Sequence, residues 1–111
     1  METKKLSQEL RDQATALYKA APQVMQAFQS VMLTANKSAA LPAKIKELMA
    51  VAISISVKCE GCIVFHVQSA IKHGATREEL VEAIGVSIEM GGGPATVYAG
   101  KALAAFDELN S

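Results

Sequence analysis

The chain has 111 residues, half of them apolar, and its eleven basic residues balance its eleven acidic ones. The lack of net charge disfavours nucleic acid and anionic membranes as partners, and no apolar run approaches the roughly 18 residues that a membrane span needs. Two cysteines are too few for a disulfide-stapled secreted fold and the first thirty residues lack a signal-peptide pattern, so we expect a cytoplasmic protein with a single domain over residues 1–111.

Helical signals recur along the whole chain without an alternating strand pattern, so the expected fold is all-α with about six helices. A first helix is predicted over about 8–20, with Ser7 as its N-cap. A second is predicted over 22–36, where Pro22 suits the first turn and apolar residues repeat at three- and four-residue spacing. Residues 37–41 are predicted to be a linker.

The third and fourth predicted helices carry the most apolar and the most reactive segments. Pro42 opens the third helix, which is apolar over a wide arc, is therefore expected to be central, and should end near Lys58. The fourth begins at the CxxC motif of residues 59–62. It should end just before Gly74, with His73 as a cap that interacts with the helix dipole.

Two further helices complete the predicted fold. The segment Thr76-Arg-Glu-Glu79 is a capping box that starts the fifth helix. Three glycines, 91–93, break that helix, and Pro94 starts a sixth that ends around Leu109. The glycines favour a helix break over a phosphate-binding loop, because no strand precedes them and no Lys-Ser or Lys-Thr follows.

The CxxC motif, followed by a histidine, indicates a redox dithiol. At the N-terminus of a helix, the free backbone N–H groups and the dipole favour the thiolate of Cys59. Cys62 lies about one turn further on, close enough for a small disulfide loop. His66 follows Cys62 by four residues on the same helical face, where its imidazole can act as a base. Glu60, inside the motif, places a negative charge near the thiols.

Glu47 becomes a candidate if the third and fourth helices form an antiparallel hairpin around residue 58. Glu47 then lies roughly 16 Å from the bend and His66 roughly 11 Å, a difference of about one helical turn. The carboxylate could bond the imidazole directly or through one water, orient it and raise its basicity.

Other interpretations of these residues remain open. The cysteines could be inert apolar side chains. A zinc site from Cys59, Cys62, His66 and His73 would require His73 to act from about 10 Å beyond His66 along one helix, so we expect neither a metal nor a bound cofactor. The methionines at 25, 32, 49 and 90 fall on apolar faces and are expected to pack in the core or in a subunit interface.

The motif as a whole resembles the signature of a known family. Glu47, eleven intervening residues, Cys59-x-x-Cys62 and then His66 are similar to the signature of the alkylhydroperoxidase D-like proteins of the carboxymuconolactone decarboxylase superfamily. The flanking segment 46–54 and Met90-Gly-Gly-Gly-Pro-Ala extend the similarity over roughly residues 41–108.

This resemblance implies an all-helical protomer, assembled as a trimer or hexamer, that reduces organic hydroperoxides. In such proteins Cys62 would be attacked by the peroxide, Cys59 would resolve the sulfenic acid, and His66 with Glu47 would form a proton relay. Electrons would come from a second dithiol, a lipoyl group or a thioredoxin-like protein. The chain departs from the pattern at Gly61, where these peroxidases often carry a histidine.

Two questions stay open from the residues. The helix terminus favours Cys59 as the attacking cysteine and the nearby base favours Cys62; we predict Cys62. The alternatives to a peroxidase are a disulfide reductase or a non-catalytic redox-sensing oligomer. A third is a carboxymuconolactone decarboxylase-like enzyme that uses His66 and Glu47 as acid and base. The true decarboxylases generally lack the CxxC motif, which argues against lactone decarboxylation.

Overall fold

The structure, a computed structural model, describes residues 2–110, which form six helices joined by short turns and one longer loop. The helices are α1 (Glu2–Ala20), α2 (Pro22–Asn36), α3 (Ala43–Ser56), α4 (Glu60–Lys72), α5 (Arg77–Gly91) and α6 (Gly93–Leu109). The predicted all-α class is confirmed, as is the position of the CxxC motif at the start of the fourth helix.

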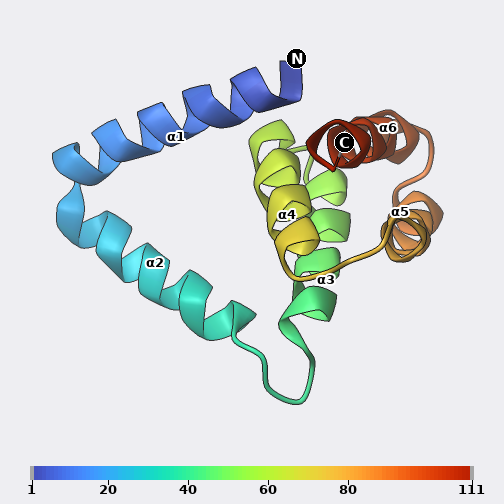
Figure 1. The fold of residues 1–111 in the computed structure, drawn as a ribbon, viewed down its shortest axis with the longest axis horizontal. Helices are drawn as coiled ribbons and strands as arrows, with labels where there is room; N and C mark the ends of the chain where they lie inside the picture. The colour runs from blue at the N-terminus through green and yellow to red at the C-terminus, as the bar shows by residue number, and fades with distance from the viewer. Residues whose placement is uncertain (1, 111) are drawn as a thin grey trace.

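Helices α3 to α6 form the body of the protein (Figure 1). Its core is aliphatic, and its largest fully buried side chains are Val51, Ile55, Ile63, Val67 and Leu80. Each such side chain contributes about 1.5–3 kcal/mol of burial free energy. The buried face of α6 is mostly alanine, which lets this helix approach α4 and α5 closely.

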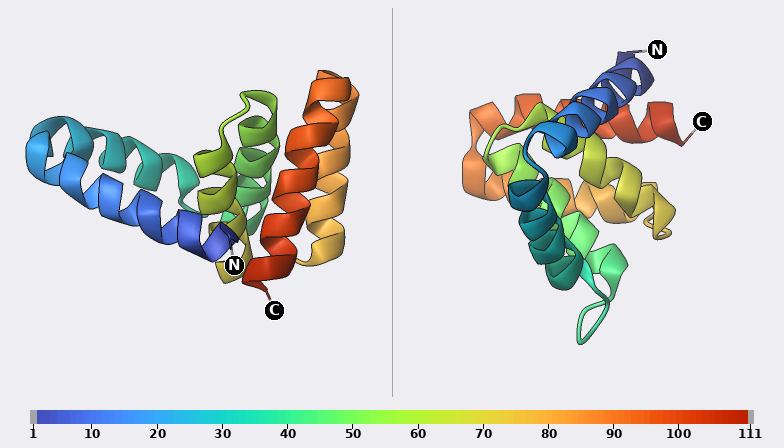
Figure 2. Two further views of the ribbon diagram at one scale, coloured as in Figure 1. Left: turned by 90° about the horizontal axis from the view of Figure 1, so that it is seen from above. Right: turned by 90° about the vertical axis from the view of Figure 1, so that its left-hand side faces the viewer.

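Helices α1 and α2, which we call the arm (residues 2–36), project away from the body (Figures 1 and 2). α2 packs only against α1 and α3 and has no buried residue. The apolar residues of α2 lie at the predicted three- and four-residue spacing, but the apolar face that they form is exposed in the single chain. The exposed apolar side chains of the arm are Leu17, Val24, Phe28, Val31 and Leu33.

The predicted start of the first helix was wrong, because tertiary contacts replace the local cap. α1 begins at Glu2, and the carboxylate of Glu108 in α6 accepts the Thr3 N–H at 3.0 and 3.2 Å. Ser7, the predicted N-cap, instead lies buried inside the helix, and its hydroxyl donates to Gln68 at 3.2 Å. The free N–H groups at the start of a helix can donate to any nearby acceptor, and here the acceptor is the carboxylate of Glu108, which is distant in sequence.

Several other boundaries and packing predictions were corrected. The third helix starts at Ala43, with Pro42 as its N-cap, and ends at Ser56. Gly91 is still helical, and Gly92, at φ +69°, is the residue that separates α5 from α6. Met49 and Met90 are exposed in the single chain, so they do not belong to its core, and their place in a subunit interface stays a prediction.

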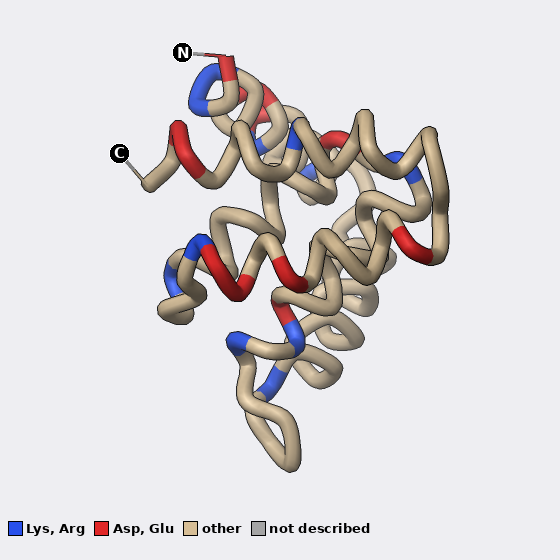
Figure 3. The backbone as a smooth tube through the Cα atoms, turned by 90° about the vertical axis from the view of Figure 1, so that its right-hand side faces the viewer, with Lys and Arg blue, Asp and Glu red and all other residues tan. Residues whose placement is uncertain are grey.

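The surface charges are distributed without a dominant sign. In the view of Figure 3, acidic and basic residues both occur along the chain, and α5 has Arg77 at its start followed only by acidic charges. Among residues 2–110, none of the helices combines the length and the apolar character that crossing a membrane would require.

The pKa values of two carboxylates, Glu79 and Asp107, predict how the stability of the fold depends on pH. The backbone N–H of Thr76 and the ammonium of Lys44 lower the pKa of Glu79, and the guanidinium of Arg77 lowers the pKa of Asp107. The unfolded chain therefore binds these protons first, so the stabilisation is complete above the ordinary carboxyl pKa of about 4 and is lost as pH falls through the lower folded values. We expect the melting temperature to decline below about pH 4.5. The decline should be shallower in the Glu79→Gln/Asp107→Asn double variant; identical acid profiles by circular dichroism would contradict this.

Candidate active site

The turn between α3 and α4 places the CxxC motif. The backbone N–H of Cys59 donates to the carbonyl of Ser54 at 3.0 Å, and that of Lys58 donates to Ile55 at 3.2 Å. These two bonds are those of a Schellman motif, in which the residue after the C-cap has positive φ. Lys58 takes this position with φ 58°, an uncommon conformation for a residue with a side chain. The turn thus ends α3 and presents Cys59 directly at the start of α4.

Cys59 is the N-cap of α4, and it forms a disulfide with Cys62. The two Cα atoms are 5.2 Å apart, a normal separation for a disulfide. The Cys62 N–H donates to the Cys59 sulfur at 3.2 Å. In the reduced protein the same N–H and the helix dipole would stabilise a Cys59 thiolate.

The Glu47 carboxylate and the His66 imidazole are paired about one helical turn beyond the CxxC motif. Oε1 of Glu47 lies 2.7 Å from Nδ1 of His66, so the antiparallel pairing of α3 and α4 brings together the residues that the spacing suggested. Glu47 is only 3% exposed, and it is the one ionisable residue among the buried side chains of residues 2–110. A buried carboxylate is costly unless it is paired, and here the histidine pairs it.

The pairing decides which imidazole nitrogen is available for chemistry. A carboxylate accepts, so Nδ1 carries the proton and donates to Glu47. In the neutral imidazole, Nε2 is then the unprotonated nitrogen, which could take up a proton from a thiol one turn away. The ring of Phe65 meets the imidazole edge-on with the centroids 5.0 Å apart. The side chain of His66 is 19% exposed, so the site is shielded yet accessible.

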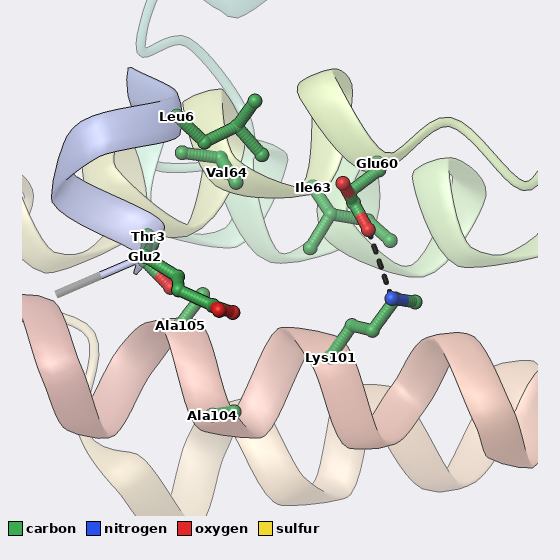
Figure 4. A pocket seen from close by; sticks show the side chains of 9 residues that line it. All are labelled: Glu2, Thr3, Leu6, Glu60, Ile63, Val64, Lys101, Ala104 and Ala105. Carbon is green, nitrogen blue, oxygen red and sulfur yellow. Dashed lines mark ion pairs between the residues drawn. The ribbon is translucent and has the colours of Figure 1, made fainter. Parts of the chain in front are cut away.

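The charge of Glu60 inside the motif is offset by a partner on another helix. Nζ of Lys101 in α6 lies 2.9 Å from the Glu60 carboxylate (Figure 4). This contact raises the pKa of Lys101. The negative charge beside the thiols is therefore matched by a positive one.

Gly61 faces the arm. A Cβ added at this glycine would lie 3.3 Å from a methyl group of Leu10, tighter than an ordinary contact, and it would have to displace that side chain. Any side chain at position 61 would therefore press against Leu10 of α1. The glycine allows α1 to lie close against the first turn of α4.

The structure thus gathers Cys59, Cys62, His66 and Glu47 around the N-terminal half of α4. His73 stays apart as the C-cap of the same helix, with Nδ1 2.9 Å from the Ser69 carbonyl. No cluster of three or more His, Cys, Asp or Glu side chains able to hold a metal occurs in the described part of the chain.

Sequence reasoning missed three neighbours of the site: Leu10, Phe65 and Lys101. Only Phe65 had a local signal, since it stands three residues after Cys62 and so shares its side of the helix. Leu10 and Lys101 come from distant elements, α1 and α6, and no spacing along the chain predicts their contacts.

Comparison with known proteins agrees with this geometry. Residues 22–105 match the model of the carboxymuconolactone decarboxylase family, which is most of the chain. The chain belongs to the carboxymuconolactone decarboxylase family. This family membership is consistent with the resemblance to alkylhydroperoxidase D-like proteins that the motif suggested.

The chain is similar in fold to two solved structures of the carboxymuconolactone decarboxylase family and in sequence to a further relative. A crystal structure of a family protein from Legionella pneumophila superposes with a TM-score of 0.96 at 40% identity, over 99% of this chain and 98% of that one. An uncharacterised protein of Cupriavidus necator is 50% identical over 93% of this chain and 91% of its own length. A Thermotoga maritima member, for which a part in the antioxidative response has been suggested, has the same fold at a TM-score of 0.83, with 24% identity over 96% and 90% of the two chains.

Proposed function

We propose that this protein is a cytoplasmic thiol peroxidase that reduces organic hydroperoxides through its Cys59–Cys62 dithiol. The observation that carries the proposal is the buried Glu47–His66 pair, which stands one helical turn from the Cys59–Cys62 disulfide at a helix N-terminus. A dithiol alone would suit many roles, whereas a buried base with its own orienting carboxylate suits proton transfer.

The proposed cycle balances in three steps. The Cys62 thiol gives its proton to Nε2 of His66, and the thiolate attacks the hydroperoxide: an S–O bond forms, the O–O bond breaks, and the leaving alkoxide takes the proton and departs as alcohol. The Cys59 thiol then attacks the sulfenic acid, so that an S–S bond forms and water leaves. A donor dithiol, a lipoyl group or a thioredoxin-like protein, reduces the disulfide and is itself oxidised.

A disulfide reductase is the second candidate, and Gly61 favours it. The histidine that the peroxidases often carry before the second cysteine is absent here, where Gly61 stands and a Cβ would meet Leu10 at 3.3 Å. The relay then consists of His66 and Glu47 alone. Exchange between dithiols needs only a thiolate and a disulfide, so it tolerates a shorter relay.

We further propose that the protomers assemble into a trimer or hexamer. The single chain exposes 6936 Å², whereas a compact monomer of this mass exposes roughly 5,900 Å². The excess of roughly 1,000 Å² is about the area that each partner buries in a standard interface. Much of it is apolar side chain on the arm, where Val24, Phe28 and Val31 are exposed.

The function is tested by mixing the reduced protein with a stoichiometric organic hydroperoxide. We expect both thiols to disappear far faster than those of an ordinary cysteine, with intact mass showing an intramolecular disulfide and sedimentation showing a trimer or hexamer. Turnover with dihydrolipoamide should follow. Thiol loss at the background rate, together with fast reduction of a small disulfide by the reduced protein, would replace the peroxidase by the reductase.

A further inference from the structure

A pocket of about 440 Å³ opens on the side of the relay away from α1. It lies between the end of α2, the loop that follows it, the start of α3 and the middle of α4. Its size falls within the usual range for small-molecule sites. Its large apolar lining residues are Met32 and Leu33 from the arm and Phe65 from α4, and its polar lining residues include Lys37, Ser69 and His73.

The relay carboxylate forms part of this pocket. Glu47 lines it, and its Oε1 is bonded to His66. Its other oxygen makes no hydrogen bond within residues 2–110, yet every side-chain oxygen or nitrogen sealed from solvent in that range has a partner. Oε2 therefore keeps a small solvent-exposed area, and Glu47 lines the pocket. A carboxylate in this position repels anions and accepts from neutral hydrogen-bond donors.

The cysteines and His66 do not line the pocket, but Phe65 connects it with them. Phe65 lines it, and Phe65 stands three residues after Cys62, so the two side chains are neighbours on α4. The same ring packs edge-on against His66. A molecule whose reactive end lies at Cys62 and His66 would then pass over Phe65 to place its other end beside Met32 and Leu33.

We propose that this pocket holds the organic group of the hydroperoxide, a compact neutral alkyl or aryl group, and that Met32 determines the preference for such substrates over hydrogen peroxide. This inference rests on the proposed peroxidase function and names its substrate class. Hydrogen peroxide would react at the same cysteine without using the pocket.

The test compares cumene hydroperoxide with hydrogen peroxide on the full-length protein. In Met32→Ala, the ratio of kcat/KM for cumene hydroperoxide to that for hydrogen peroxide should fall about tenfold, because apolar contact is removed from one substrate only. Ser69→Leu, which fills the pocket, should lower the same ratio at least as much. The matched control is Met90→Ala, an exposed methionine of α5 that does not line the pocket, and it should leave the ratio unchanged.

A second measurement separates failure of the pocket from failure of the peroxidase. Binding of the product cumyl alcohol, followed by ligand-detected NMR, needs no turnover and should weaken in Met32→Ala and Ser69→Leu. Slow reaction with both peroxides, but binding of the alcohol that depends on Met32, would overturn the peroxidase and support the pocket. A ratio within twofold of wild type in both variants, or alcohol binding that neither variant changes, would overturn the pocket.

Discussion

Replacing Cys62 with serine is expected to abolish the rapid reaction with hydroperoxide, whereas replacing Cys59 should leave the first step and block the second. The reason is the position of each cysteine on α4. Cys62 lies one turn from the base His66, whereas Cys59 is the N-cap of the helix. In Cys59→Ser, Cys62 should become a sulfenic acid that accumulates, because no resolving thiol remains. Intact mass should show the gain of one oxygen atom, and a sulfenic-acid trap should label Cys59→Ser but not Cys62→Ser.

The opposite labelling pattern would assign the attack to Cys59. The structure contains a physical basis for that outcome as well, since the Cys62 N–H already donates to the Cys59 sulfur. In that case the lower pKa of the Cys59 thiol, and not the nearness of Cys62 to His66, would determine which cysteine attacks. Melting curves of both variants serve as the control, because both cysteines are only partly buried and neither substitution should unfold the protein.

Loss of the relay is the second large expected effect. A positioned general base contributes roughly 10²–10⁴-fold, so His66→Ala should slow thiol oxidation by about 10²-fold or more. Added imidazole should restore part of the rate. Glu47→Gln should cost less, about tenfold, because the amide keeps the shape of the side chain but no longer favours a proton on Nδ1. Stopped-flow measurements across pH should show the rate of His66→Ala rising only where the free thiol ionises.

The control for Glu47→Gln is Glu89→Gln, which removes the same charge from an exposed position on α5. It should react at the wild-type rate. If Glu47→Gln also reacts at that rate, the buried pair has a structural role only. If a variant with both cysteines replaced by serine still transforms an acid–base substrate, the decarboxylase-like alternative gains support and the dithiol loses its catalytic role.

The antiparallel placement of α3 and α4 shows that the spacing of residues along the chain can predict a long-range contact. Glu47 and His66 are nineteen residues apart, and their contact follows from two helices of known rise that fold back at one turn. Few other long-range contacts could be obtained this way. The Glu60–Lys101 pair and the Leu10–Gly61 contact depend on how α6 and α1 pack, and the periodicity of a helix does not specify its partner.

The sequence by itself determined the features that local chemistry controls: six helices, the capping box at Thr76, the helix end at Gly74 and a CxxC motif at a helix N-terminus. These signals act within one or two turns, so they survive without knowledge of the fold. The tertiary structure alone decided the early start of α1, the exposed apolar arm and the pocket beside Glu47. Each of these features depends on how segments that are far apart in the sequence pack against one another. The periodicity within one helix does not specify which other helix it will contact.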